Sequence, residues 1–471
     1  MKSGIRCGFA VIFIFALVSG ASAQWSNDPA RNLPLSDKSD GADQVQPKVR
    51  PLPKGGWYVS WFDADPNSPP PVGYSVYLQR LSAEGVEMFP HDGVEVAHLG
   101  LSSTEDYGLD VDTGNHPLLA FLDDREGDNP QVTAVRLNGS GKPLWGKLGV
   151  QLTNDESFHA APKIAGASDG SIIVAWTSDS NVVLQKLDSD GNAQWGSGVV
   201  LGESGFNYGL SDLHAADDGS VIVSWVRDQG FGSNRYLYAN KISSAGKLLW
   251  GKSHVKVFDG GSLQFGSFPY FVPDGNGGAV FSWYSSSPAL QSFAQHILAD
   301  GTEAFGHNGS VASTDTVHVR VDPSASYRPA GDEVFLFWTE EDSNQVMNGI
   351  YAQKFDGTGA RKWGQTGTVV VPLGSDQQIF ARNLQINGGA EVFWVDQQGF
   401  GSATIQAVRL NRKGKVVCSQ FPVSSLPANK SGLSAGISRS GLAALAFEDD
   451  RLGSNGIYIQ NVNRDCSLGQ E

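Results

Sequence analysis

Five polar segments carry the residue types most able to bind a ligand, and each directly follows an apolar run. They span 123–128, 227–233, 340–342, 396–402 and 448–454. They combine carboxylates with arginines, and two of them contain Gly-Phe-Gly-Ser, which sets an aromatic ring on a flexible support. Carboxylates can bind sugar hydroxyls, a cation or basic groups of a partner. The candidate binding residues are Asp123, Arg125, Arg227, Asp228, Phe231, Glu340, Asp342, Asp396, Phe400, Asp449 and Arg451.

A structural role is the alternative for several of these residues. In a repeating chain, an Asp or Arg that recurs after the same strand often bonds to loop amides or to a neighbouring repeat. The residues concerned are Asp123, Asp228, Asp396 and Asp449, together with Phe231 and Phe400 as plugs between repeats. The tryptophans are expected in the core, where losing one large aromatic side chain costs ~3–5 kcal/mol.

The rest of the chain offers no catalytic group that stands out. The nine histidines show no His-x-Glu-x-His or His-x-x-x-His spacing, so no pair of them forms a local zinc site. We predict neither a catalytic nucleophile nor a phosphate-binding loop, and no cofactor. A metal site assembled from distant parts of the chain stays open.

The first 23 residues have the features of a secretory signal peptide. Lys2 and Arg6 precede the apolar run 9–18, which is too short to span a bilayer, and Ala21-Ser22-Ala23 has the small-residue cleavage pattern. We therefore expect cleavage after Ala23, no membrane insertion, and a secreted or periplasmic mature protein.

Charge and cysteine content limit which partners the protein can bind and which cellular compartment it suits. The chain carries 34 Lys plus Arg against 49 Asp plus Glu, a formal net charge of −15, and such a body repels nucleic acid. Once Cys7 leaves with the leader, Cys418 and Cys466 remain, and two cysteines in an exported protein suggest one disulfide. Two unpaired thiols are the alternative, because a bridge needs Cα atoms within about 7 Å.

One unit repeats eight times along the chain. An apolar run closes on a large aromatic residue at intervals of 49 to 60 residues, and each run is too short for a helix and rich in β-branched residues. A tight-turn signal such as Asp169-Gly170 precedes each run, which predicts a hairpin into a doubly buried strand. The closing aromatics are Trp61, Phe121, Trp176, Trp225, Trp283, Trp338, Trp394 and Phe447.

Two further strands follow in each unit. The third, as in 183–187 or 351–355, alternates apolar and polar residues, which predicts one buried and one wet face. The fourth follows a second turn and is marked by Trp145, Trp195, Trp250 and Trp363, with Phe89, Phe305 and Cys418 at the same place. Such four-stranded units, in a chain with 57 Gly and 12 Trp, are typical of a β-propeller.

We therefore predict an all-β fold, a single eight-bladed β-propeller of four-stranded antiparallel blades over residues 24–471. A row of small sandwiches or an open solenoid is the alternative. The eighth unit lacks its fourth strand and residues 24–36 reproduce its form, so we expect the N-terminus to complete blade 8 and close the ring. The expected blades span about 46–98, 104–154, 158–204, 207–261, 265–315, 317–375, 378–425 and 430–465.

The repeat has the form turn-apolar-Trp-Asp, then Tyr-Ala-Gln-Lys-Leu-Asp, then Gly-x-x-x-Trp-Gly. This form resembles that of secreted bacterial β-propeller repeat proteins, which are mostly uncharacterised, and it covers essentially all of 24–471. The resemblance implies the fold and says little about activity, because propellers host many functions. Segment 190–195 is also similar to the sialidase Asp-box and to integrin-type calcium loops, but it departs from both patterns, so neither function is carried over.

The expected function is that of an exported, non-enzymatic binding or scaffold module that recognises a protein or a glycan through its acidic loops. The alternative is a carbohydrate-active enzyme, a glycosidase or lyase, with two carboxylates as acid and base about 5–10 Å apart across a cleft. A concave pocket at the channel mouth that brings together carboxylates from several blades would favour the enzyme.

Overall fold

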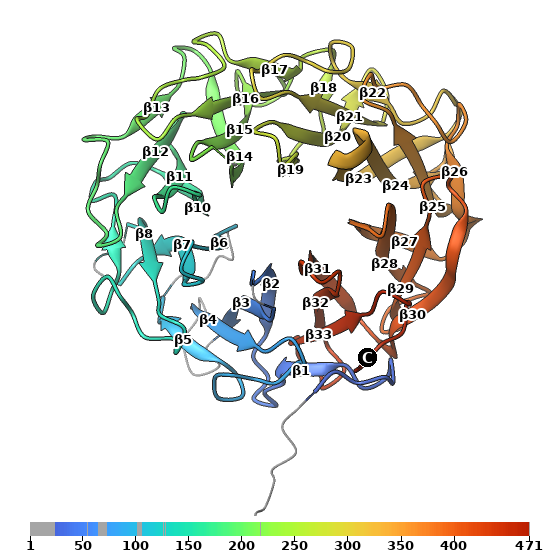
Figure 1. Ribbon diagram of the computed structural model, residues 1–471, viewed down its shortest axis with the longest axis horizontal. Helices are drawn as coiled ribbons and strands as arrows, with labels where there is room; N and C mark the ends of the chain where they lie inside the picture. The colour runs from blue at the N-terminus through green and yellow to red at the C-terminus, as the bar shows by residue number, and fades with distance from the viewer. Residues whose placement is uncertain are drawn as a thin grey trace, which may run out of the picture.

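The strands form eight antiparallel sheets arranged as blades around a central channel (Figure 1). The computed structural model describes residues 24–53, 55–64, 73–100, 106–125, 127, 129–216 and 218–470. The predicted eight-bladed β-propeller is confirmed. The expected leader, residues 1–23, lies outside the described residues. The search of the described residues for an apolar helix of membrane-crossing length finds none.

Each blade runs from an inner strand at the channel to an outer strand at the rim. Blades 1 to 4 comprise β2 (Gln44–Pro51), β3 (Trp57–Ala64), β4 (Tyr74–Leu81) and β5 (Val94–Ala97); β6 (Gly108–Val111), β7 (Pro117–Asp123), β8 (Gln131–Arg136) and β9 (Val150–Gln151); β10 (His159–Gly166), β11 (Ile172–Ser178), β12 (Asn181–Leu187) and β13 (Val199–Leu201); and β14 (Asn207–Ala215), β15 (Val221–Asp228), β16 (Tyr236–Ile242) and β17 (Val255–Phe258).

The second half of the ring follows the same order. Blades 5 to 8 comprise β18 (Ser262–Leu263), β19 (Phe271–Pro273), β20 (Ala279–Ser287), β21 (Gln291–Ile297) and β22 (Ser310–Val311); β23 (Val319–Arg328), β24 (Glu333–Glu341), β25 (Asn348–Phe355) and β26 (Thr368–Gly374); β27 (Gln377–Ile386), β28 (Gly389–Gln397), β29 (Ala403–Leu410) and β30 (Val416–Ala428); and β31 (Lys430–Ile437), β32 (Ala443–Asp449), β33 (Gly456–Val462) and β1 (Leu33–Ser36).

Blade 5 departs from the predicted four strands because its inner strand is divided. Both β18 and β19 pair with β20, and residues 264–270 between them leave the ladder. This interrupted stretch contains Phe265, Phe268 and Tyr270, all of which are exposed. The irregularity therefore places three aromatic rings beside the channel.

The second strands form the core of the ring, as the doubly buried runs predict. The closing aromatics Trp61, Trp225 and Trp283 are essentially inaccessible to solvent. Such side chains lie between adjacent blades, so each blade buries its faces only against its neighbours.

The third strands differ from the expectation of one wet face. Gln79, Gln185 and Gln353 are buried, because the side-chain amide of each caps the backbone where the chain turns toward the fourth strand. In blade 3, Gln185 Nε2 donates to the Gly196 carbonyl at 3.0 Å, and its Oε1 accepts from the Trp195 amide at 3.0 Å. A polar residue that satisfies backbone groups is buried at little cost.

Aromatic side chains at the outer rim connect successive blades. Each of five tryptophans donates its indole N–H to a carbonyl in the turn of the next blade, over 2.7 to 3.2 Å; they are Trp25, Trp145, Trp195, Trp250 and Trp363. The ring lies on a glycine of that turn, where a Cβ atom would collide, as Gly301 shows with 2.7 Å to Trp250. Phe89 and Phe305 lie in the same way on Gly141 and Gly359. We call these seven pairs the rim contacts.

The eighth junction has a disulfide where the others have a rim contact. The predicted Cys418–Cys466 pair is present, with the Cα atoms 6.4 Å apart. Cys418 follows Leu410 by the interval that separates Trp195 from Leu187, so it occupies the position of a rim aromatic. Cys466 occupies the position of the rim glycine, and like that glycine it has a positive φ, here 72°. A covalent bond thus joins blades 7 and 8.

The N-terminus closes the ring through β1, which pairs with β33. Leu33 lies opposite Ile459, and Leu35 is fully buried. The predicted strand 24–36 is therefore shorter than expected. Trp25 does not join it, because its side chain forms the rim contact with Gly85 in blade 1.

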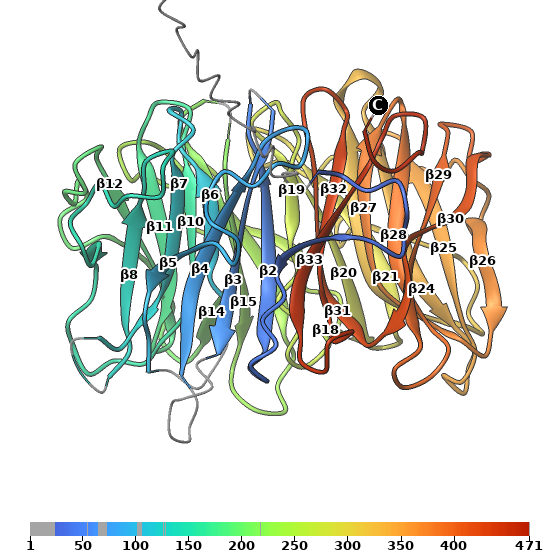
Figure 2. The same cartoon turned by 90° about the horizontal axis from the view of Figure 1, so that it is seen from below.

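The ring has two unlike faces. One carries the loops from second to third strands and the connections between blades, and we call it the loop face; it is the lower edge in Figure 2. The opposite turn face carries the tight turns from first to second strands and from third to fourth strands. Inner strands begin at the loop face, so loop-face residues surround one mouth of the channel.

Candidate functional site

The predicted loop carboxylates are each held by groups close to them. Asp123 accepts from Arg125 Nε at 2.8 Å, and Arg125 Nη2 also donates to the Leu148 carbonyl at 2.9 Å. The buried Asp449 accepts in the same manner from Arg451 at 2.5 Å and also pairs with Lys430. Such pairs fix the loop conformation.

The remaining candidate carboxylates also have nearby partners. Asp228 accepts from Asn207 Nδ2 and from the Gly230 amide, Asp396 from Gln378, and Asp342 from the Val346 and Met347 amides. Arg227 forms an ion pair with Glu203 at 2.6 Å and covers the ring of Phe206. None of the eleven candidates lines the central cavity. Their role in binding stays a prediction.

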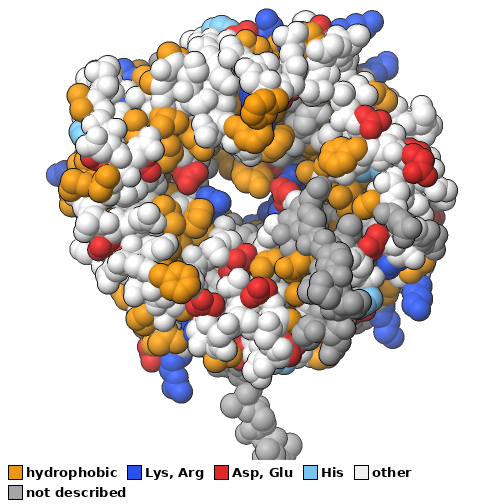
Figure 3. All heavy atoms as spheres, turned by 180° about the vertical axis from the view of Figure 1, so that it is seen from behind, with side chains coloured by type: hydrophobic (Ala, Val, Ile, Leu, Met, Phe, Trp, Pro, Cys, Tyr) orange, Lys and Arg blue, Asp and Glu red, His pale blue; other side chains and the backbone are white. Residues whose placement is uncertain are grey.

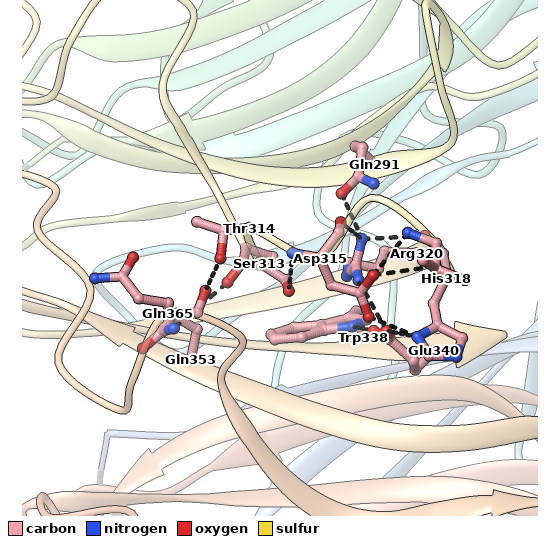
Figure 4. A network of polar contacts seen from close by, with 12 residues as sticks. Gln291, Ser313, Thr314, Asp315, His318, Arg320, Trp338, Glu340, Gln353 and Gln365 are labelled. Carbon is pink, nitrogen blue, oxygen red and sulfur yellow. Dashed lines mark hydrogen bonds and ion pairs between the residues drawn. The ribbon is translucent and has the colours of Figure 1, made fainter. Parts of the chain in front are cut away.

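Glu340 belongs to a buried network near the loop face of blade 6 (Figure 4). Its carboxylate accepts from Trp338 Nε1 at 2.6 Å and from Arg320 Nη2 at 2.9 Å. Asp315, His318 and Glu340 lie close enough to hold a metal ion together. The guanidinium of Arg320, however, already supplies the positive charge between the two carboxylates. The network therefore fits a structural role better than a metal site.

Phe231 and Phe400 are the two predicted residues that the structure leaves free of the protein body. Their side chains are 97% and 93% exposed, so neither is a plug between blades. Phe231 meets Phe265 edge to face, with ring centroids 6.0 Å apart. A large apolar side chain kept in water on a tightly turned Gly-Phe-Gly-Ser loop is typical of a contact residue.

Exposed aromatic rings are restricted to the loop face. Among the described residues, every exposed Phe, Tyr or Trp lies in a loop of this face or in the part of an inner strand next to it. Figure 3 shows this face, with hydrophobic side chains beside the central hollow and charged side chains along its edge. The rings are Phe158, Phe231, Phe265, Phe268, Tyr270, Phe380 and Phe400.

The hollow is a cavity of about 680 Å³ lined by the inner strands of all eight blades. In seven blades the strand registers identify one equivalent position, opposite the residue that precedes the core aromatic. In blade 5 the corresponding residue is Tyr270, which directly precedes the Phe271–Phe281 pair. All eight of these positions line the cavity. They hold Lys48, Gly108, Lys163, Asp212, Tyr270, Ser324, Arg382 and Ser434.

A recurrent β-bulge directs these side chains. In five blades the residue two places earlier has positive φ, although only one of the five is glycine; they are Gln46, Ala161, Asp322, Phe380 and Gly432. The register shifts there, which bends the inner strand at the cavity. Backbone strain of this kind gathers at functional sites.

A cluster of opposite charges occupies one wall of the cavity. The Asp106 carboxylate pairs with Lys48 at 2.6 Å and with Lys163, and it lies 3.3 Å from the Tyr270 hydroxyl. Burial alone would raise the pKa of Asp106, but the two ammonium groups outweigh it and hold that pKa well below its usual range. One carboxylate therefore faces two cations.

Two more carboxylates, from other blades, line the same cavity. Asp212 accepts from His214 at 3.0 Å and from the Phe271 amide, and these contacts lower its pKa although burial alone would raise it. Burial raises the pKa of Asp322, and the charge of Arg382 offsets part of that rise. The cavity thus gathers carboxylates from blades 2, 4 and 6.

Three segments have the spacing of catalytic motifs but not their context. Residues 141–147 and 246–253 match a phosphate-binding loop, yet both cross a turn between β-strands, and no helix follows. Residues 432–436 match Gly-x-Ser-x-Gly, but Ser434 lies within β31 and accepts from the Val49 amide at 3.0 Å. None of them forms the site that its spacing describes.

The cavity residues were missed because no residue type marks them. In six blades they stand 13 residues before the core aromatic, as Lys48 does before Trp61. The interval is 14 in blade 6 and 12 in blade 7, where the hairpin turns differ in length. Aligning the eight units on their aromatics would have revealed the set.

Comparison with known proteins identifies no family and finds structural similarity only at low sequence identity. No family model and no curated protein matches the sequence. Among solved structures, the chain is similar to the Dos1 propeller (12% identity, TM-score 0.49, 91% of this chain and 95% of that one) and to the polysaccharide lyase Uly1 (11%, 0.47, 89% and 90%). It is also similar to an α-L-arabinanase of Penicillium chrysogenum solved with arabinobiose (11%, 0.41, 95% and 100%).

Proposed function

We propose that this propeller is an exported glycan-binding module whose ligand lies across the loop face at the channel mouth. The observation that carries the proposal is the restriction of exposed aromatic rings to that face. Flat apolar rings stack on the C–H faces of sugars, and the polar cavity between them offers donors and acceptors for hydroxyl groups.

The size and shape of the site favour a glycan over a protein partner. A cavity of about 680 Å³ is in the range of small-ligand pockets, roughly 300–1,000 Å³. Phe231 and Phe400 stand on blades 4 and 7, so the exposed rings do not form one continuous patch. The disulfide supports export to a secreted or periplasmic location, because such bonds persist in oxidising compartments.

A glycan array probed with residues 24–470 tests the proposal. Replacing both Phe231 and Phe400 by Ala should weaken binding to any glycan hit by about fivefold or more, from the lost stacking. Leu144→Ala with Leu249→Ala is the control, because these residues are large, apolar and partly exposed but belong to the turn face. No hit on a broad array, or equal loss in both double variants, would overturn the proposal.

A glycoside hydrolase is the second candidate, and it is favoured by the cavity that gathers carboxylates from blades 2, 4 and 6. Two carboxylates of the cavity have pKa values displaced in opposite directions, Asp322 upward by burial and Asp212 downward chiefly by His214. That division suits a general acid and an ionised partner. Release of new reducing ends from a glycan hit, abolished in Asp322→Asn while binding persists, would establish the enzyme; an unchanged glycan after prolonged incubation would leave the binding module.

A further inference from the structure

The wall of the cavity is more basic than the chain as a whole. The chain has a formal net charge of −15, yet the lining holds four cations, Lys48, Arg50, Lys163 and Arg382, against the three carboxylates already described. Of these cations, Arg50 pairs at 3.6 Å with Asp110, which lies outside the lining. Cations gathered in a concave, partly buried site act on a ligand more strongly than the same charges on an open surface.

The cations are only partly neutralised. Lys48 and Lys163 share the single carboxylate of Asp106 as their ion-pair partner, and the charge of Asp212 also acts on Lys163. Arg382 forms no ion pair with a carboxylate of the described residues, and its guanidinium donates to the Ala381 carbonyl at 2.9 Å. Several of its N–H donors are thus available to a ligand.

Tyr270 lies between these two centres of charge. Asp106 and burial raise the pKa of Tyr270 to about 12, while Lys163 and Arg382 act against that rise. The hydroxyl therefore stays protonated at neutral pH and donates to Asp106 Oδ2 at 3.3 Å. Its ring is more than half exposed and belongs to the aromatic set of the loop face. One residue thus joins the stacking surface to the cationic wall.

We propose that the channel mouth binds the anionic group of an acidic sugar, with Arg382 and the Lys48–Lys163 pair as its cationic partners and the Tyr270 ring as the stacking surface beside them. This inference rests on the proposed glycan binding and narrows it to acidic glycans. A sugar carboxylate and a sugar sulfate share the required chemistry, since both accept paired hydrogen bonds from a guanidinium.

Titration calorimetry with three oligosaccharides tests the proposal: an oligogalacturonate, its methyl ester, and a sulfated galactan fragment. We expect the carboxylated or the sulfated oligomer to bind at least about tenfold more tightly than the neutral ester. The preferred one of the two identifies the anionic group. Equal affinities for all three oligosaccharides would overturn the inference and leave glycan binding intact, whereas no binding to any array glycan would overturn both proposals.

Charge variants identify the responsible side chain. Arg382→Gln should lose the preference for the acid, and Arg382→Lys should recover part of it. Arg439→Gln is the matched control, because it removes the same charge from an exposed turn-face residue. Phe400→Ala should weaken acid and ester alike. If Arg382→Gln has the same melting temperature as the native protein and keeps the full preference for the acid, the inference is wrong.

Discussion

The outer rim and the channel wall contrast within each repeat. At the rim, equivalent positions hold five Trp, two Phe and one Cys, whereas at the wall they hold Lys, Gly, Asp, Tyr, Ser and Arg. The rim residues all have the same structural role, because each joins one blade to the next. The wall residues face a cavity rather than a neighbouring blade, so packing does not dictate them. We conclude that the repeated residues maintain the ring, and we propose that the unrepeated ones select its ligand.

The largest expected effect comes from removing the closing segment. Deletion of residues 24–36 removes β1 and the buried side chains of Trp25, Leu33 and Leu35, which should lower the free energy of unfolding by about 5 kcal/mol or more. It also leaves the edge of β33 unpaired, which should promote aggregation. Scanning calorimetry and light scattering measure both effects; an unchanged melting temperature would contradict the role of the rim in closure.

The disulfide offers a test of whether the rim positions are interchangeable. Replacing both cysteines by Ser should cost about 4 kcal/mol, given a loop of 48 residues. Cys418→Trp with Cys466→Gly restores the residue types of a rim contact and should recover about 2 kcal/mol of that loss. Denaturant unfolding of the native protein and the two double variants measures these differences in stability. If the Trp and Gly pair is no more stable than the Ser pair, the two junctions are not equivalent.

A pair of glycines separates rim packing from backbone strain. Gly301 and Gly251 both have positive φ, at 87° and 84°, but only Gly301 lies against the Trp250 ring. Gly301→Ala should therefore be about 2 kcal/mol less stable than Gly251→Ala. Both substitutions have the same conformational cost of a positive φ, but only the Cβ atom at position 301 collides with the Trp250 ring. Equal losses in thermal unfolding would show that the indole moves aside freely.

The smallest expected effect is a pH dependence at the closure. Burial alone would lower the pKa of His91, but its hydrogen bonds to Asp37 and Glu87 outweigh it and raise the pKa; His307, with Glu303 and Asp259, behaves likewise. The stabilisation is complete below the unfolded-state pKa of about 6.5 and is lost as pH rises through the higher folded value.

Thermal melts of His91→Gln with His307→Gln measure this contribution. The melting temperature of the double variant should lie further below that of the native protein at about pH 5.5 than at about pH 8.5, because the stabilisation is lost as the pH rises through the raised pKa values. Both side chains are about half exposed, so the difference should be small. A deficit that grows with pH would have the wrong sign for these pairs.

Most of the ring was predictable because the packing of buried strands requires a recognisable pattern of residue types in the sequence. Dense runs ending in Trp225 or Trp283 have one physical explanation, a doubly buried strand, and a glycine turn before each run sets its limits. The cysteine pair followed from positions in neighbouring units. The buried Gln185 was misread, since alternation of polar and apolar residues does not reveal a side chain that caps its own backbone.

The candidate site was predictable only in part. Phe231 and Phe400 were visible because Gly-Phe-Gly-Ser is an unusual loop, but the neighbouring Asp and Arg residues are largely bonded within the protein. Arg382 and Lys163 were not recognised from their own segments, because a bulge at Phe380 or Ala161 sets their direction and neither residue type favours positive φ. The position of Tyr270 follows from the division of the inner strand of blade 5, and no sequence signal predicts that division.

A crystal structure of the protein with its best array glycan tests the central claim most directly. The account predicts sugar rings stacked on loop-face aromatics such as Phe231, Tyr270 or Phe400, with a polar or anionic substituent at the channel mouth within hydrogen-bond distance of Arg382. A glycan bound only at the turn face or against the rim contacts, with the cavity left to solvent, would contradict it.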